Sequence, residues 1–202
     1  MTSDLFSTSI VHLIKHDGEV DYYPNALVQS KAQYYFDNLI SHPSWAHDQF
    51  MMFGKPITTK RKIMWVGEQP FLYRYAGATK QAEPWPDTVL DIKQVVETLT
   101  QTTFNSCLLN LYHNGSESMG WHSDNEPELK KNGMIASVSL GAQRRFRFKH
   151  KATKQTASVV LESGSLLTMA GELQSHWQHA LPVTKKIDTP RINLTFRSIN
   201  QN

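Results

Sequence analysis

Two short motifs in the second half of the chain carry side chains that bind metal ions. His122 and Asp124 are separated by one residue, so on an extended segment both side chains point the same way and can reach one ion. A second motif supplies His176 and His179. Two histidines and one carboxylate form the facial triad that binds Fe(II) and leaves positions for a bidentate ligand and dioxygen. A zinc hydrolase can use the same ligands with water, and a surface loop explains the first motif when it is taken alone.

The segment 191–197 favours the oxygenase over the hydrolase. Strand alternation places Arg191, Asn193, Thr195 and Arg197 on one face and three apolar side chains on the other. A guanidinium is a planar fork that binds a carboxylate through two hydrogen bonds, so this face can hold an acidic co-substrate. The alternative is a strand face exposed to solvent.

The composition indicates one folded domain over residues 1–202. Hydrophobic residues make up 40% of the 202 residues and charged residues 19%, which is enough apolar surface for a core and too little charge for disorder. The net charge of +3 permits a polyanionic partner without requiring one. The single cysteine, Cys107, excludes a disulfide framework and favours a reducing compartment. With no signal peptide or long apolar segment, we expect a soluble cytoplasmic protein without membrane contact, the nucleus or nucleoid being the alternative.

Two helices are expected before the strand-rich part of the chain. Residues 1–24 are expected to be irregular or to form short strands. Apolar spacing predicts one helix from Asn25, as N-cap, to Ile40, and a second from about residue 87 to Thr100.

The sequence after the second expected helix is typical of a β-protein. Six β-rich runs follow one another, at residues 106–112, 134–140, 145–148, 157–161, 165–169 and 191–198. Runs at such short intervals, without intervening helices, favour an antiparallel sandwich or jelly roll with the two helices packed outside.

In the order and spacing of its motifs, the chain from about residue 104 to 198 resembles the AlkB family of Fe(II)/2-oxoglutarate-dependent dioxygenases, in its nucleic-acid repair branch. The matching motifs are Asn110-Leu111-Tyr112, His122-Ser123-Asp124-Asn125-Glu126, residues 135–141, Gly164-Ser165-Leu166-Leu167, residues 176–182 and residues 191–197. The resemblance implies a mainly β fold with flanking α: a double-stranded β-helix, or jelly roll, as the catalytic core at 104–198, with N-terminal helices.

The resemblance also assigns roles to single residues. His122, Asp124 and His179 match the metal ligands, which leaves His176 as a structural residue. The contacts to 2-oxoglutarate match Asn110, Tyr112, Arg191, Asn193, Thr195 and Arg197. Glu126 matches the acidic side chain that reads the exocyclic amino group of the damaged base, with Asn125 beside it.

The aromatic-rich segment 44–86 has no sustained helical period and is predicted to form hairpins and loops. In the family this region is a lid that recognises the nucleotide. The resemblance places the tip of a finger hairpin at Phe53, Gly54 and Lys55, and it assigns base stacking and phosphate contact to Tyr73, Arg74 and Tyr75. Such stacking offsets the cost of extracting a base, although most aromatics here can equally be core residues. Basic residues at 60–62 and 144–154 are expected to follow the phosphates.

The activity that the resemblance implies is oxidative demethylation of 1-methyladenine and 3-methylcytosine. The substrate is single- or double-stranded DNA, with RNA as an alternative. The cofactors are Fe(II), 2-oxoglutarate and O2, and the products are succinate, CO2 and formaldehyde. Two other functions stay open: an oxygenase acting on a small molecule or a protein side chain, and a binding module with a vestigial metal site. We expect a monomer.

Overall fold

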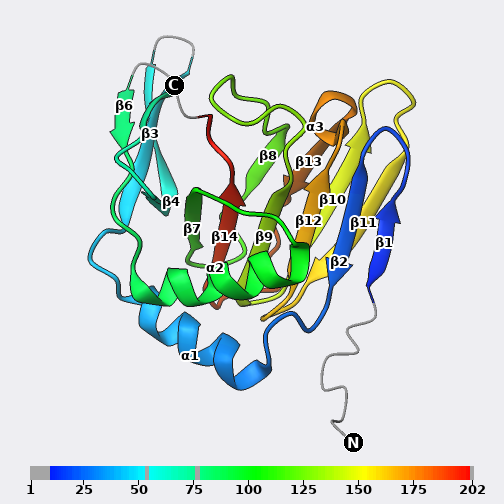
Figure 1. Ribbon diagram of the computed structural model, residues 1–202. Helices are drawn as coiled ribbons and strands as arrows, with labels where there is room; N and C mark the ends of the chain where they lie inside the picture. Colours follow the sequence, from blue (N-terminus) through cyan, green and yellow to red (C-terminus); the bar gives the residue numbers. More distant parts are fainter. Residues whose placement is uncertain (1–9, 53–54, 76–77, 201–202) are drawn as a thin grey trace, which may run out of the picture.

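The computed structural model describes residues 10–52, 55–75 and 78–200 and is mainly β (Figure 1). An eight-stranded sheet has the order β1 (Val11–Ile14), β2 (Glu19–Tyr23), β12 (Leu166–Ala170), β9 (Ile135–Gly141), β14 (Arg191–Arg197), β7 (Ser106–Tyr112), β4 (Lys55–Gly67) and β3 (Ala46–Met52). A four-stranded sheet has the order β11 (Thr156–Leu161), β10 (Arg144–His150), β13 (Trp177–Leu181) and β8 (Met119–His122). A short hairpin joins β5 (Leu72–Tyr75) to β6 (Ala78–Gln81).

The two main sheets pack face to face as a jelly roll. A cluster of buried apolar side chains lies between them, with Ile135 and Leu167 from the large sheet and Phe148, Leu161 and Trp177 from the small one. The neighbouring strands pair antiparallel, as in β9 with β14 and β10 with β13. The mainly β, jelly-roll expectation is therefore confirmed.

Two helices cover the outer face of the large sheet (Figure 1). The helix α2 spans Asp87–Thr100, as predicted, and buries Val89, Ile92 and Val96. The helix α1 spans Gln29–Ile40, so the prediction that Asn25 is its N-cap is wrong. The N-cap is Val28, because Leu27 is buried and its backbone N–H donates to the carbonyl of Gly164 at 2.9 Å, which keeps the preceding residues out of the helix. A third helix, α3 (Leu173–His176), is a single turn between β12 and β13.

The segment 44–86 consists mostly of strands, and two of them, β3 and β4, belong to the large sheet. β3 and β4 form a hairpin, and β4 then continues along β7, pairing from Lys62 with Leu111 to Gly67 with Ser106. Among the described residues, no helix is long and apolar enough to span a membrane.

Candidate active site

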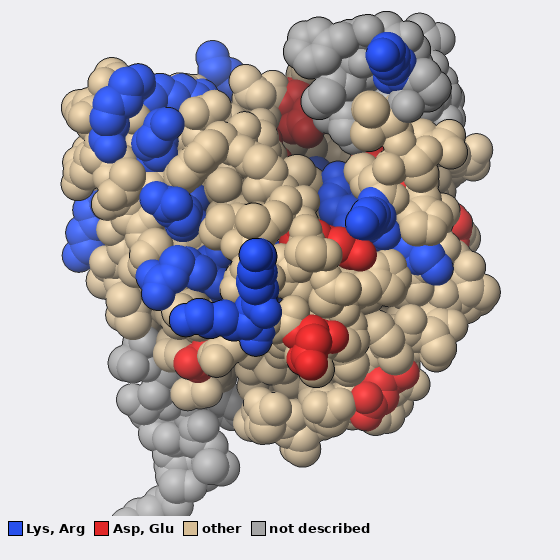
Figure 2. Space-filling view, turned by 180° about the vertical axis from the view of Figure 1, so that it is seen from behind, with Lys and Arg blue, Asp and Glu red and all other residues tan. Residues whose placement is uncertain are grey.

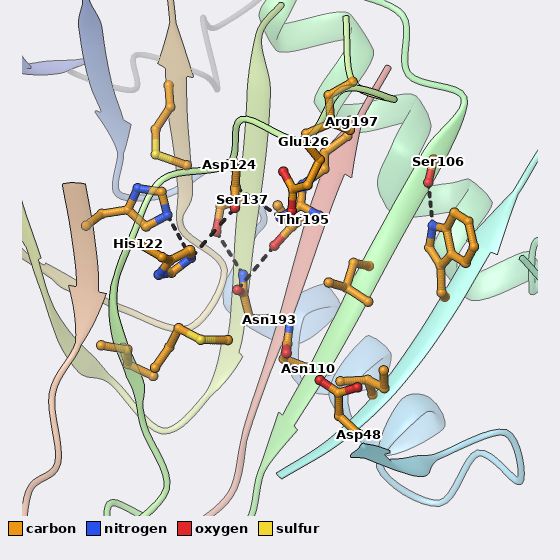
Figure 3. Close-up of a pocket in the computed structure, with 18 of the residues that line it drawn as sticks. Asp48, Ser106, Asn110, His122, Asp124, Glu126, Ser137, Asn193, Thr195 and Arg197 are labelled. Carbon is orange, nitrogen blue, oxygen red and sulfur yellow. Dashed lines mark hydrogen bonds and ion pairs between the residues drawn. The ribbon is translucent and has the colours of Figure 1, made fainter. Parts of the chain in front are cut away.

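The three predicted metal ligands lie together at one end of the jelly roll. His122 ends β8, and His179 stands directly opposite it on β13. Their Nε2 atoms are 3.1 Å apart, and an oxygen of Asp124 lies 3.7 Å from the Nε2 of His122. One candidate ligand atom from each residue lies within 4.8 Å of the other two. The arrangement predicted from the two motifs is therefore present, and Figure 3 labels two of its members, His122 and Asp124.

The protonation states suit a divalent cation. The Nδ1 of His122 donates to the carbonyl of Gly120 at 2.9 Å, so the neutral ring carries its lone pair on Nε2, toward the other two ligands. Burial lowers the pKa of His179 to about 4, which keeps this ring neutral at pH 7. Burial alone would raise the pKa of Asp124, but Arg197 and the two histidines outweigh it and lower that pKa to about 2. Two neutral imidazoles and one carboxylate are the donor set that Fe(II) takes in a facial triad.

A cavity of about 280 Å³ opens beside the triad and crosses the inner face of the large sheet. Its wall includes the four polar residues of β14, namely Arg191, Asn193, Thr195 and Arg197. The alternating residues Ile192, Leu194 and Phe196 are fully buried in the core on the helix side. This face of β14 is therefore the wall of a cavity, and the alternative of a solvent-exposed strand face is wrong.

Arg191 gives the far part of this cavity a buried positive charge. It is 2% exposed and donates to the hydroxyl of Ser139 at 2.9 Å. Burial lowers its pKa to about 10, so the guanidinium stays charged at neutral pH. Tyr112 lies opposite it in register, with its ring 5.6 Å from the guanidinium carbon. The Oδ1 of Asn110 is also buried and has no hydrogen-bond partner among the described residues. A buried cation beside polar atoms without partners fits the carboxylate of a small acid.

Arg197 and Glu126 lie nearer the metal ligands. Arg197 donates to Asp124 at 2.9 Å, so it contacts the predicted ligand directly. Glu126 lines the cavity, whereas Asn125 is exposed and lines a neighbouring hollow instead. Figure 3 shows Glu126 close to Arg197.

The predicted lid contacts are described only in part. Lys55 begins β4 and is exposed. Phe53 and Gly54 lie outside the described residues. The side chains of Tyr73, Arg74 and Tyr75 also lie outside the described part of the structure, which gives the backbone of β5 alone.

Sequence reasoning missed a wall of the cavity that comes from β3 and β4. Arg61, Ile63 and Trp65 alternate along β4 and face the cavity, together with Asp48 of β3. Arg61 donates to Asp48 at 3.2 Å, and both side chains are about nine-tenths buried. The prediction that Arg61 and Arg144 follow phosphates, as parts of 60–62 and 144–154, is wrong, because the first side chain is mostly buried and the second is fully buried. No alternation of polar and apolar residues marks this wall in the sequence, because residues 61–66 are two basic residues followed by four apolar ones.

A second group of side chains that could bind a metal ion contains an internal hydrogen bond. Asp17, His150 and His176 lie within ligand distance of one another. The backbone N–H of Thr153 donates to Nδ1 of His150 at 3.0 Å, so the proton of that ring is on Nε2, which donates to Asp17 at 3.0 Å. The neutral ring of His150 thus has no lone pair left for a metal ion.

Comparison with known proteins identifies the family. The family model of the 2OG-Fe(II) oxygenase superfamily matches residues 19–197. The chain is 40% identical over 156 residues to human "DNA oxidative demethylase ALKBH2", covering 73% of this chain and 60% of that protein. It is 33% identical over 187 residues to human "Alpha-ketoglutarate-dependent dioxygenase alkB homolog 3", covering 88% of this chain and 65% of that protein. The chain spans less than two thirds of the length of either relative.

A solved structure agrees on the fold. OsALKBH1 superposes with a TM-score of 0.64 at 17% identity, over 92% of this chain and 99% of that chain. The chain belongs to the 2OG-Fe(II) oxygenase superfamily and, within it, to the AlkB family that its motifs resemble. The superfamily uses Fe(II) and 2-oxoglutarate, and the His122, Asp124 and His179 group is the candidate metal site in this chain.

Proposed function

We propose that this protein removes methyl groups oxidatively from 1-methyladenine and 3-methylcytosine in DNA, using Fe(II), 2-oxoglutarate and O2. The observation that carries the proposal is the His122, Asp124 and His179 group at one end of a cavity whose wall holds the buried cation Arg191. The names of the relatives, which include a DNA oxidative demethylase, support the choice of substrate.

His122, Asp124 and His179 would hold the iron, and the polar side of β14 with its neighbours on β7 would hold 2-oxoglutarate. Arg191, Tyr112 and Asn110 would bind the distal carboxylate, with Asn193 and Thr195 beside them and Arg197 at the metal end. When bound, Fe(II) and 2-oxoglutarate supply the activation of O2 that oxidises the methyl group, with succinate, CO2 and formaldehyde as products. The chain's own part is to fix the two carboxylates of the co-substrate and to exclude water from the cavity.

The base would enter on the side of Glu126, which lines the cavity and can accept a hydrogen bond from an exocyclic amino group. Asn125, Phe53, Gly54, Lys55, Tyr73, Arg74 and Tyr75 stay predictions for the nucleotide contacts. Extraction of the base costs a few kcal/mol, which contacts of this kind must offset.

The outer face of the small sheet supports a polyanionic substrate. Arg145, Arg147 and Lys149 alternate on the outward side of β10, and Arg147 and Lys149 lie 5.6 and 5.3 Å from the ring of the half-exposed Trp121. Figure 2, which shows the molecule from the side opposite to Figure 1, has lysines and arginines gathered on one part of the surface. We propose that this face follows the DNA backbone.

We further propose that residues 1–202 act as one domain and as a monomer inside the cell, in the cytoplasm, the nucleus or the nucleoid. The division into a lid at 44–86 and a catalytic core at 104–198 also stays a prediction.

The test is to incubate the protein with Fe(II), 2-oxoglutarate, ascorbate and an oligonucleotide carrying one 1-methyladenine, and to follow the mass of the oligonucleotide. Single-stranded DNA, duplex DNA and RNA of one sequence are compared, and Asp124→Ala serves as the inactive control. Loss of the methyl group only with 2-oxoglutarate supports the proposal. Succinate without a change in the oligonucleotide would instead favour a small molecule or a protein side chain as substrate. The absence of succinate would contradict the metal assignment.

A further inference from the structure

The turn that carries Asp124 is held from behind by α3. The backbone N–H of Asp124 donates to Oε1 of Gln174 at 2.9 Å. The hydroxyl of Ser123 donates to the carbonyl of Trp177 at 2.8 Å. Since Arg197 binds the carboxylate at 2.9 Å, Asp124 is fixed both at its backbone and at its side chain.

Gln174 supplies a hydrogen-bond acceptor that the strand pairing does not provide. β8 ends at His122, and the next residues leave the sheet, so the N–H of Asp124 has no acceptor in the strand pairing of β8. Asp124 is buried, and a buried N–H without a partner costs about 1–3 kcal/mol. Because an N–H only donates, the amide of Gln174 must present its oxygen to Asp124, and its Nε2 then faces the sulfur of Met169 at 3.8 Å.

The support behind Gln174 is itself fixed. The adjacent Leu173 is 1% exposed, and its backbone lies so close to Gly18 that a Cβ added there would be 2.5 Å from it. The ammonium of Lys151 donates to the carbonyls of Gln174 and Ser175 at 2.8 and 3.0 Å. The short helix thus cannot shift without disturbing two neighbouring turns.

We propose that Gln174 is a positioning residue for the metal site, acting on Asp124 through its backbone. This inference rests on the proposed function, since it takes Asp124 to be a ligand. The hydrogen bond from Asp124 to Gln174 keeps the carboxylate oxygen within ligand distance of the nitrogens of His122 and His179. Without it, the buried N–H turns to find another acceptor and moves the carboxylate away from them. Groups that orient a ligand in this way are typically worth about 10- to 100-fold in metal affinity.

The experiment compares Gln174→Met with Gln174→Glu. Both replacements have nearly the volume of glutamine, but only glutamate keeps an oxygen that accepts the N–H of Asp124. Purified protein is titrated with Co²⁺, and the visible absorption of the bound ion reports both affinity and coordination. Gln155→Met, in the exposed turn after β10, is the matched control, and Asp124→Ala identifies binding at the active site.

We expect Gln174→Met to bind Co²⁺ about 10- to 100-fold more weakly with an altered absorption spectrum, and Gln174→Glu and Gln155→Met to bind it as the unmodified protein does. Equal losses in the Met and Glu variants would overturn the inference, because packing alone would then explain them. Normal binding by Gln174→Met, with binding abolished in Asp124→Ala, would overturn it while leaving the proposed function intact. If Asp124→Ala also binds normally, the metal assignment fails and the inference with it.

Discussion

Arg197, the last residue of β14, donates to a carboxylate oxygen of Asp124 at 2.9 Å in the turn after β8. This ion pair joins the large sheet to the small one at the candidate metal site. Burial alone would raise the pKa of Asp124, and Arg197 is the largest of the influences that lower it to about 2 instead. The charge of the proposed ligand therefore depends on a residue of the opposite sheet.

Replacing Arg197 by methionine should make metal binding sensitive to pH. Without the guanidinium, burial raises the pKa of Asp124, so protons compete with the metal at higher pH than in the unmodified protein. Between pH 8 and pH 5.5, we expect the affinity for Co²⁺ to fall about tenfold more in Arg197→Met than in the unmodified protein. Arg197→Lys keeps the charge and should retain most of the affinity. Parallel pH profiles for all three proteins would contradict this account.

Arg191→Met should impair 2-oxoglutarate binding selectively. A charged hydrogen bond of this kind is worth about 2 kcal/mol, so the KM for 2-oxoglutarate should rise roughly 30-fold. The KM for the methylated oligonucleotide should change little, because Arg191 lies buried beside Ser139 and Tyr112. Arg191→Lys keeps the charge but loses the fork and should fall between the two. Both constants come from succinate formation, and equal increases in both would argue against the proposed role.

The metal-free protein should lose stability on mild acidification because of His179. Its pKa is about 4 when folded, against the ordinary histidine value of 6.5, so between these values the unfolded chain binds a proton that the folded protein does not. Stability therefore falls as the pH decreases through this window, by about 3 kcal/mol in full. The pKa of Asp124 contributes only below about pH 4. In urea titrations with EDTA, His179→Gln should lose less stability from pH 7 to pH 4.5; an equal loss would show that His179 is not responsible.

Replacing Arg61 alone should lower the free energy of unfolding more than replacing Arg61 and Asp48 together. Arg61→Met leaves Asp48 as a buried charge without this cation and should lower the free energy of unfolding by about 3 kcal/mol. The double variant Arg61→Met, Asp48→Leu should recover much of that loss. Urea denaturation of the single and double variants tests the coupling, and additive losses would show that the pair does not act as a unit.

The residues of the candidate site could be predicted where their spacing along a single strand or turn indicates which way their side chains point. The alternation on 191–197 and the single-residue spacing of His122 and Asp124 follow from strand geometry, and the structure places these side chains in one cavity. Asp48 carried no such signal. It lies at an irregularity in the pairing of β3 with β4, between His47 and Gln49, which redirects its side chain toward the cavity.

The fold was predictable in its class but not in all its elements. β7 matches the predicted run 106–112, since its residues are nearly all buried and apolar. β8 and β13 were missed, because these short strands carry glycine, glutamine and the candidate metal-ligand histidines and have none of the β-branched side chains that mark strands. The prediction of Asn25 as N-cap failed because an N-cap side chain contributes only about 1 kcal/mol. The burial of Leu27 contributes more and keeps this part of the chain out of the helix.

β4 lies between β3 and β7 in the large sheet, and Lys62 and Ile63 take part in both pairings. A chimaera that exchanges residues 44–86 with those of a relative would therefore replace two strands of the large sheet. Ile63, Met64 and Val66, which are buried, would have to match the recipient's core. A chimaera that exchanges substrate-recognition residues within this family should therefore fold more readily when the two chains are joined before Lys62 than when they are joined after residue 86.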